Sequence, residues 1–177
     1  MTKALLLLVV SFAVQTGTPA RLPPIERHRV GPVVIGADAQ KIYEMFEGRR
    51  KLVDLGYEGM LSPALLLRFV GVTRRDGVVA ELVPGQGVLT VWRIEIRDPA
   101  FRTAKGIGVG STVGQLRSAY RLDSVLSGEG NVAIRVDELS ASFMLDQTGP
   151  GGSELWEVRD PARVPDSVKV TSVLLTR

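Results

Sequence analysis

The sequence has no cysteine and only one histidine, and these shortages exclude several kinds of chemistry. Without cysteine the chain forms no disulfide, has no thiol nucleophile or thiolate metal site, and carries no lipid on an N-terminal Cys. A Ser-His-Asp relay or a histidine metal site would need His28, which lies between Arg27 and Arg29, ahead of the first predicted element. We interpret His28 as a solvated surface residue and expect neither a metal nor a cofactor.

The sequence also has no large excess of positive or negative charge. The formal net charge is +3 over 177 residues, and the basic runs at 27–29, 49–51 and 74–75 are short. Binding to nucleic acid requires Lys and Arg concentrated where the phosphates lie, because affinity follows the number of phosphates neutralised. We interpret the basic runs as solvated edges and turns, and expect no nucleic-acid partner.

At its start the chain has the pattern of a cleavable secretory signal peptide, over residues 1–20. Lys3 precedes an apolar run at 4–14 (ALLLLVVSFAV), and a short stretch of small and polar residues follows. Thr18 and Ala20 supply the small residues that cleavage after Ala20 requires. The apolar run is shorter than the roughly 20 residues that cross a bilayer. We therefore expect a periplasmic or secreted protein with no membrane span after processing.

The mature chain divides by composition into a linker and two similar halves. Residues 21–32 (RLPPIERHRVGP) combine three prolines with mixed charge, which is typical of an extended linker. The halves, at 33–100 and 101–177, each have the pattern of a helix followed by strands. Together they are long enough to form one compact unit.

Each half begins with a hydrophobic run, a glycine, a capping residue and a helix with one apolar face. The two segments are VVIGADAQKIYEMF at 33–46 and IGVGSTVGQLRSAY at 107–120. Asp38 and Thr112 suit the N-cap because their side-chain oxygens accept amide hydrogens of the first turn, and Gln115 completes a capping box with Thr112. At this offset the halves share identical residues, which suggests an internal duplication. The pairs are Gly36 and Gly110, Leu52 and Leu126, Gly56 and Gly130, Leu65 and Leu139, and Phe69 and Phe143.

After each predicted helix the hydrophobic period falls to two, which is typical of strands with one buried face. In the clearest strand, Trp92 points to the same side as Ile94 and Ile96, which favours a core position for Trp92. The predicted strands are 65–69, 78–83, 89–97, 132–136, 139–145, 154–159 and 168–175. Such alternation predicts an antiparallel sheet with one solvated face. We therefore predict an α+β fold of two tandem helix-plus-antiparallel-strand repeats, with the helices packed on one face of a sheet.

The segments at 33–46 and 107–120, each followed by strands, resemble the repeat unit of the β-lactamase inhibitor proteins and of the small outer-membrane-assembly lipoproteins related to them. The resemblance spans at most residues 33–175 and carries over no individual binding residue. It implies a protein that binds other proteins through a sheet face or loops and catalyses nothing. The chain differs from that group in lacking the lipid-bearing Cys and in having few aromatic residues.

Three alternating glycines, Gly106, Gly108 and Gly110, precede the second predicted helix. Glycines before a helix N-terminus can cradle a phosphate. Their spacing matches no nucleotide-binding loop, however, and no lysine occupies the phosphate-binding position. We interpret them as positions where two backbone segments approach closely or where a strand bulges.

Two groups of residues are candidates for function. Acid–base catalysis would have to use paired carboxylates, and no spacing singles out a pair. Trp156 neighbours Leu155 in a predicted strand, so one of the two side chains must be exposed or covered by a loop, and we select Trp156 as the candidate binding residue. The carboxylates are Glu81, Glu95, Asp137, Glu138, Asp146, Glu154 and Glu157.

The sequence thus predicts an exported, non-enzymatic domain that binds an envelope or extracellular protein through its sheet face or loops. One alternative is a small secreted hydrolase that uses carboxylates alone. The other is a small-molecule carrier with an apolar pocket between helices and sheet.

Overall fold

The computed structural model describes residues 22–55, 62–72, 74, 76–128, 130–149 and 152–177. Within these ranges the chain is mostly β-structure, with one eight-stranded and one three-stranded sheet. The strands are β1 (Ile25–Glu26), β2 (Arg29–Val30), β3 (Val33–Val34), β4 (Arg50–Asp54), β5 (Pro63–Leu67), β6 (Val78–Pro84), β7 (Leu89–Ile96), β8 (Ser124–Gly128), β9 (Asn131–Val136), β10 (Ala141–Leu145) and β11 (Val170–Leu175). The α-helices are α1 (Ala39–Met45) and α2 (Val113–Ala119), and the 3-10 helices are η1 (Asp137–Leu139), η2 (Ser153–Glu157) and η3 (Pro161–Arg163).

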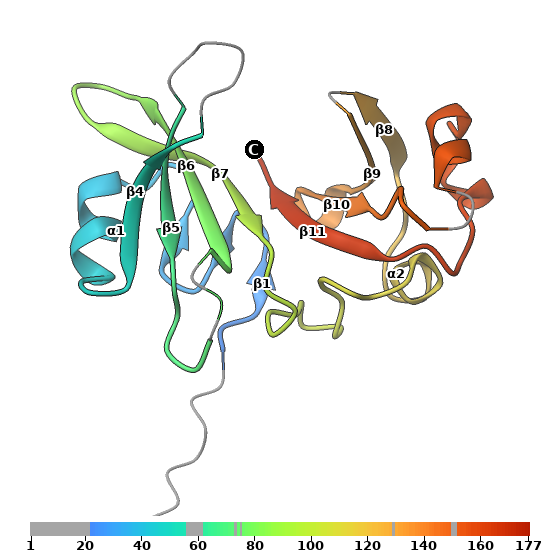
Figure 1. Ribbon diagram of the computed structural model, residues 1–177, viewed down its shortest axis with the longest axis horizontal. Helices are drawn as coiled ribbons and strands as arrows, with labels where there is room; N and C mark the ends of the chain where they lie inside the picture. The colour runs from blue at the N-terminus through green and yellow to red at the C-terminus, as the bar shows by residue number, and fades with distance from the viewer. Residues whose placement is uncertain (1–21, 56–61, 73, 75, 129, 150–151) are drawn as a thin grey trace, which may run out of the picture.

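The large sheet consists of two four-stranded meanders, β4 to β7 and β8 to β11. They are joined by the pairing of their last strands, β7 and β11. The order of the sheet is β4-β5-β6-β7-β11-β10-β9-β8, and every neighbouring pair is antiparallel. At the junction, Ile96 of β7 lies opposite Val173 of β11, and Ile94 lies opposite Leu175. Figure 1 shows the sheet bent at this junction, with α1 and α2 on the outside of the bend and the two meanders on either side of the C-terminus. β11 is therefore the last strand in the chain and a central strand in the sheet.

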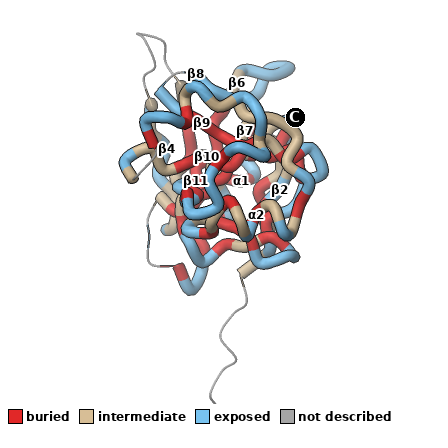
Figure 2. Tube along the Cα trace, turned by 90° about the vertical axis from the view of Figure 1, so that its right-hand side faces the viewer, coloured by how far each residue is buried: buried red, intermediate tan, exposed pale blue. Residues whose placement is uncertain are grey.

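The register of the strands places a row of apolar side chains across the middle of the large sheet, on the face that forms the core. Each member comes from a different strand, and each is fully buried. The row is Leu67, Val78, Ile96, Val173, Phe143 and Ile134. Figure 2 shows the result, since buried backbone runs through the centre of the molecule and exposed turns surround it.

Both α-helices begin at the residues that the sequence predicts. Asp38 accepts a hydrogen bond from the amide of Gln40 at the start of α1. Thr112 and Gln115 form the predicted capping box at the start of α2. Each helix has only seven residues and buries a single turn of apolar side chains in the core.

The three-stranded sheet lies partly inside the segment 21–32, which the sequence suggests is a linker. Ile25 pairs with Val30, and Val30 pairs with Val33. All three side chains are buried in the core cluster. The described part of this segment therefore belongs to the folded domain.

The predicted α+β fold of two helix-plus-strand repeats is wrong, because the molecule is mostly β-structure. Two seven-residue helices cannot cover an eight-stranded sheet, so the small sheet, η1, η2 and the loops also contribute to the core. The proposed offset of 74 residues aligns α1 with α2 and β4 with β8. It fails beyond them, since Leu65 lies in β5 whereas Leu139 lies in η1. The period-two patterns correspond to most of the structure, and each helix is only about two turns long.

The predicted strand at 154–159 is also wrong. Residues Ser153–Glu157 form the 3-10 helix η2 instead, which buries Leu155 alone. A short helical turn that buries one side chain does not require the alternation of buried and exposed residues that is typical of a strand. The nearby Pro161 begins η3, another short helical turn.

The buried row predicts the cost of removing one of its side chains. Phe143→Ala should lower the free energy of unfolding by about 3–5 kcal/mol, because it leaves a cavity at the centre of the row. Leu126→Ala is the control, since Leu126 lies in the edge strand β8 and is 46% exposed. Urea unfolding followed by circular dichroism measures both changes, and equal losses would contradict this description of the core.

Candidate binding site

The face of the large sheet opposite the core carries a second row of side chains, and we call this surface the second face. All eight strands contribute one residue to the row, which mixes charged, polar and apolar side chains. The row is Lys51, Leu66, Val79, Glu95, Leu174, Ser142, Arg135 and Ser124. The second face lies on the inside of the bend that Figure 1 shows.

Small side chains form much of the floor of the second face. Ala64 and Ala133 are buried but do not belong to the core cluster, and Ser142 and Ser172 are also buried on this face. Side chains converge on the inside of a bent sheet, so that small residues pack there without strain. Lys51, Glu95 and Arg135 lie in the same row, so the second face combines small buried residues with longer charged ones.

Trp92 stands at the rim of the second face because of an irregularity in the β6–β7 pairing. Glu81 lies opposite Arg93 and Leu82 lies opposite Val91, which leaves Trp92 without an opposite residue. Such a β-bulge inserts one residue and breaks the alternation of side chains. Val91 is buried in the core, whereas Trp92 is 39% exposed. The prediction that Trp92 is a core residue is therefore wrong, because the sequence pattern gave no sign of the bulge.

Arg93 connects Trp92 to a buried carboxylate. The Arg93 guanidinium carbon lies 4.5 Å from the centre of the Trp92 ring, and Arg93 Nε lies 2.7 Å from Oε1 of Glu81. The Glu81 side chain is only 3% exposed, and its other carboxylate oxygen is buried with no hydrogen-bond partner. These residues form a cluster in which an exposed aromatic ring, a cation and a buried anion lie in sequence from the surface inward.

A small pocket adjoins this cluster. It has a volume of about 290 Å³, below the usual range of ligand pockets, and offers room for a single side chain. Its lining is Val83, Thr90, Val91, Trp92, Thr176 and Arg177.

A network of charges lies at the other end of β7. Asp76 accepts a hydrogen bond from Arg74, and Arg97 lies between Asp76 and Glu95. The hydrogen bond from Arg74 is the main reason why the pKa of Asp76 is lowered from its ordinary value, and the same bond raises the pKa of Arg74. The charges of this network are satisfied within the chain, so they frame the second face without leaving a strong excess of one sign.

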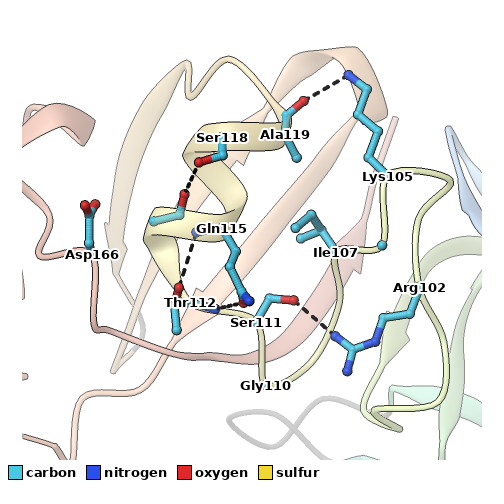
Figure 3. Close-up of a pocket in the computed structure, with 12 residues that line it drawn as sticks. Arg102, Lys105, Ile107, Gly110, Ser111, Thr112, Gln115, Ser118, Ala119 and Asp166 are labelled. Atoms are coloured by element: carbon cyan, nitrogen blue, oxygen red, sulfur yellow. Dashed lines mark hydrogen bonds between the residues drawn. The ribbon is translucent and has the colours of Figure 1, made fainter.

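A larger hollow lies elsewhere in the described structure, beside α2 (Figure 3). It is an open groove of about 1110 Å³ between α2 and the loop that precedes it. Arg102 donates to Ser111 Oγ, and Lys105 donates to the carbonyl oxygen of Ala119 and to Glu138. These bonds attach the loop to α2 and η1, so we interpret the groove as part of the structure that holds the loop in place.

The alternating glycines lie in this loop. A Cβ at Gly108 would collide with the carbonyl oxygen of Phe101, so the close backbone approach predicted for these glycines is confirmed there. Gly106 and Gly110 have φ angles of +80° and +84°, which favour glycine for a different reason, the absence of a Cβ in a left-handed conformation.

Trp156, the binding residue that the sequence singles out, lies in η2. Its side chain is partly buried and packs against the core cluster, while its carbonyl oxygen accepts a hydrogen bond from Arg159. Trp156 and Trp92 therefore lie on different surfaces of the molecule. The predicted cleavage site at Ala20 lies outside the described residues.

Two of the seven candidate carboxylates, Glu81 and Glu95, lie on neighbouring strands of the second face, and each is paired with an arginine. The others lie in turns and 3-10 helices: Asp137, Glu138, Asp146, Glu154 and Glu157. In the part of the chain that the structure describes, no group of three or more His, Cys, Asp or Glu side chains is arranged to hold a metal ion.

His28 lies in the turn between β1 and β2, with a φ angle of +62°. It is partly buried, and its Nε2 is buried without a hydrogen-bond partner, so the interpretation of His28 as a solvated residue is wrong. Separately, the described residues contain no helix with the length and apolar character needed to span a membrane.

Comparison with known proteins adds one finding. No family model and no curated protein matches the sequence. Among solved structures, the chain is similar to the uncharacterized protein yfeY from Escherichia coli, with a TM-score of 0.56 and 13% sequence identity over 88% of this chain and 99% of that chain. At this identity the likeness shows the fold alone.

The buried ion pair predicts an asymmetry between single and double substitutions. Arg93→Leu should lower the free energy of unfolding by about 3–5 kcal/mol, because the Glu81 carboxylate stays buried after its partner is removed. The double variant Glu81→Leu with Arg93→Leu should be more stable than Arg93→Leu alone, since no charge remains in the low-dielectric site. Urea unfolding measures both, and a double variant that loses the sum of the two single effects would refute the assignment.

Proposed function

We propose that this protein is exported and acts by binding another protein of the envelope or extracellular space on the second face. The observation that carries the proposal is Trp92, which a β-bulge places at the rim of that face with Arg93 stacked beside it. Tryptophan and arginine are the residues most enriched where binding energy concentrates in protein interfaces. β-Bulges often direct a side chain at a functional site, and this bulge directs Trp92 to the surface.

The shape of the second face agrees with this proposal. It spans eight strands, has a floor of small residues and carries a pocket that fits one side chain. Arg93, Arg97 and Arg135 are partly exposed along it, with side-chain exposures of 22%, 31% and 20%. Half-buried arginines already held in place by carboxylates lose little side-chain freedom on binding, which favours affinity.

Export forms the second part of the proposal and rests on residues 1–20. We expect the secreted or periplasmic form to begin at Arg21, after cleavage behind Ala20. Mass spectrometry of the intact protein from the envelope and the medium measures this directly. Full-length protein found in the cytosol would contradict it.

Binding is tested by photo-crosslinking from defined positions. A photoreactive amino acid at Leu66 or Leu174, both on the second face, should crosslink the mature protein to a specific partner in its native envelope. The same amino acid at Met45, which is exposed on α1 on the outside of the bend, is the matched control. Equal crosslinking from Met45 would count against the second face.

Affinity for the partner identified in this way is then measured with substitutions. Trp92→Ala should weaken binding by about 2 kcal/mol, roughly thirtyfold in Kd, because it removes an anchor at the rim. Met45→Ala should leave the Kd unchanged. Trp156→Ala tests the residue predicted from the sequence, and a loss there with no loss in Trp92→Ala would move the site to η2.

A further inference from the structure

The strand β4 is one edge of the large sheet, and three of its five residues are charged. Its central residue, Leu52, lies opposite the buried Leu65 and so belongs to the core face, yet it is 56% exposed. Exposed edge strands normally carry charges or bulges that prevent pairing with other strands. β4 has a regular register throughout and combines charges of both signs with an exposed leucine.

The hydrogen bonds at the two ends of β4 show which backbone groups face the edge. The amide of Arg68 donates to the carbonyl of Arg49, and the amide of Leu55 donates to the carbonyl of Ser62. In an antiparallel pair, hydrogen-bonded residues alternate with residues whose backbone groups point the other way. The odd-numbered residues of β4 therefore bond to β5, and residues 50, 52 and 54 direct their N–H and C=O groups outward.

We propose that β4 pairs antiparallel with β4 of a second copy of this chain, with the two-fold axis at Leu52. This register places Arg50 opposite Asp54 of the other copy, at both ends of the pair, and Leu52 opposite Leu52. All three of these pairs use the outward backbone groups. Opposite charges and an apolar pair facing across strands are each favourable.

Charge complementarity favours a second copy over an unrelated strand. Lys51 lies opposite Val53 in this register, so no two like charges face one another directly. A different partner would have to supply an acidic and a basic residue at the same spacing and in the opposite order. The other edge, β8, has an exposed leucine, Leu126, but no charged residue that would select a partner.

The Arg50 side chain is held against α1. Its guanidinium carbon lies 3.7 Å from the centre of the Tyr43 ring on α1, and its Nε is buried without a hydrogen-bond partner. Asp54 is exposed, and its carboxylate accepts a hydrogen bond from the amide of Ser62. The association leaves the second face free, so it is independent of the proposed partner binding.

The absence of cysteine gives a clean test. Leu52→Cys places two thiols at opposite positions of a hydrogen-bonded pair, a spacing that a disulfide can bridge. Mild oxidation should convert this variant to a covalent dimer. Leu126→Cys, on the other edge strand, is the matched control and should stay monomeric.

Sedimentation velocity of the unmodified mature protein measures the association itself. A single strand pair is a small interface, so we expect monomer at low-micromolar concentration and dimer at higher concentration. Arg50→Glu should lower the dimer fraction at least tenfold, and adding Asp54→Lys to it should restore dimerisation by exchanging the charges. Monomer at all concentrations, equal oxidation of the two cysteine variants, or no effect of Arg50→Glu would each overturn the proposal.

Discussion

The pairing of β7 with β11 is the interaction on which the rest of this structure depends. Only three residue pairs join the two strands, and two of them, Ile94 with Leu175 and Ile96 with Val173, are buried on the core face. Through these pairs the apolar row of one meander continues into the other. The same junction turns two small sheets with separate faces into one sheet with a single core and a single second face.

The chemistry of the second face follows from this arrangement. Because the sheet bends at the junction, the residues inside the bend are crowded, and alanine and serine fill positions that would otherwise be exposed. The bulge in β7 has the opposite effect, since it places Trp92 at the surface where a regular strand would bury it. The exposed ring on which the proposed binding surface depends is therefore a consequence of one irregularity in the β6–β7 pairing.

Local patterns in the sequence predicted the elements well and their assembly poorly. The caps at Asp38 and Thr112 and the strand around Ile94 depend on neighbouring residues, so the sequence shows them directly. The bulge at Trp92 depends on how β6 lies against β7, and the buried position of Ile25 depends on a sheet formed with β2. Neither contact leaves a periodic signal. The α+β prediction was wrong because it assumed that two short helices form a complete layer over the sheet.

The ion pair of Glu81 with Arg93 could not have been predicted from the sequence either. Glu81 lies between two apolar residues of β6 and has the pattern of a solvent-facing position in an alternating strand. It is buried because Arg93 and the inside of the bend cover it. Two residues of opposite charge in separate strands carry no information about register until the strands are paired.

The central place of β11 has a consequence for how the chain reaches this structure. The strand that joins the two meanders is synthesised after β7 and β10, and until it is in place both of these strands present open edges. Contacts between such distant parts of a chain are slow to form, and unpaired edges are sites of aggregation. The large sheet is therefore completed only after β11 is made, and a chain that stops short of β11 is expected to expose two edges open to aggregation.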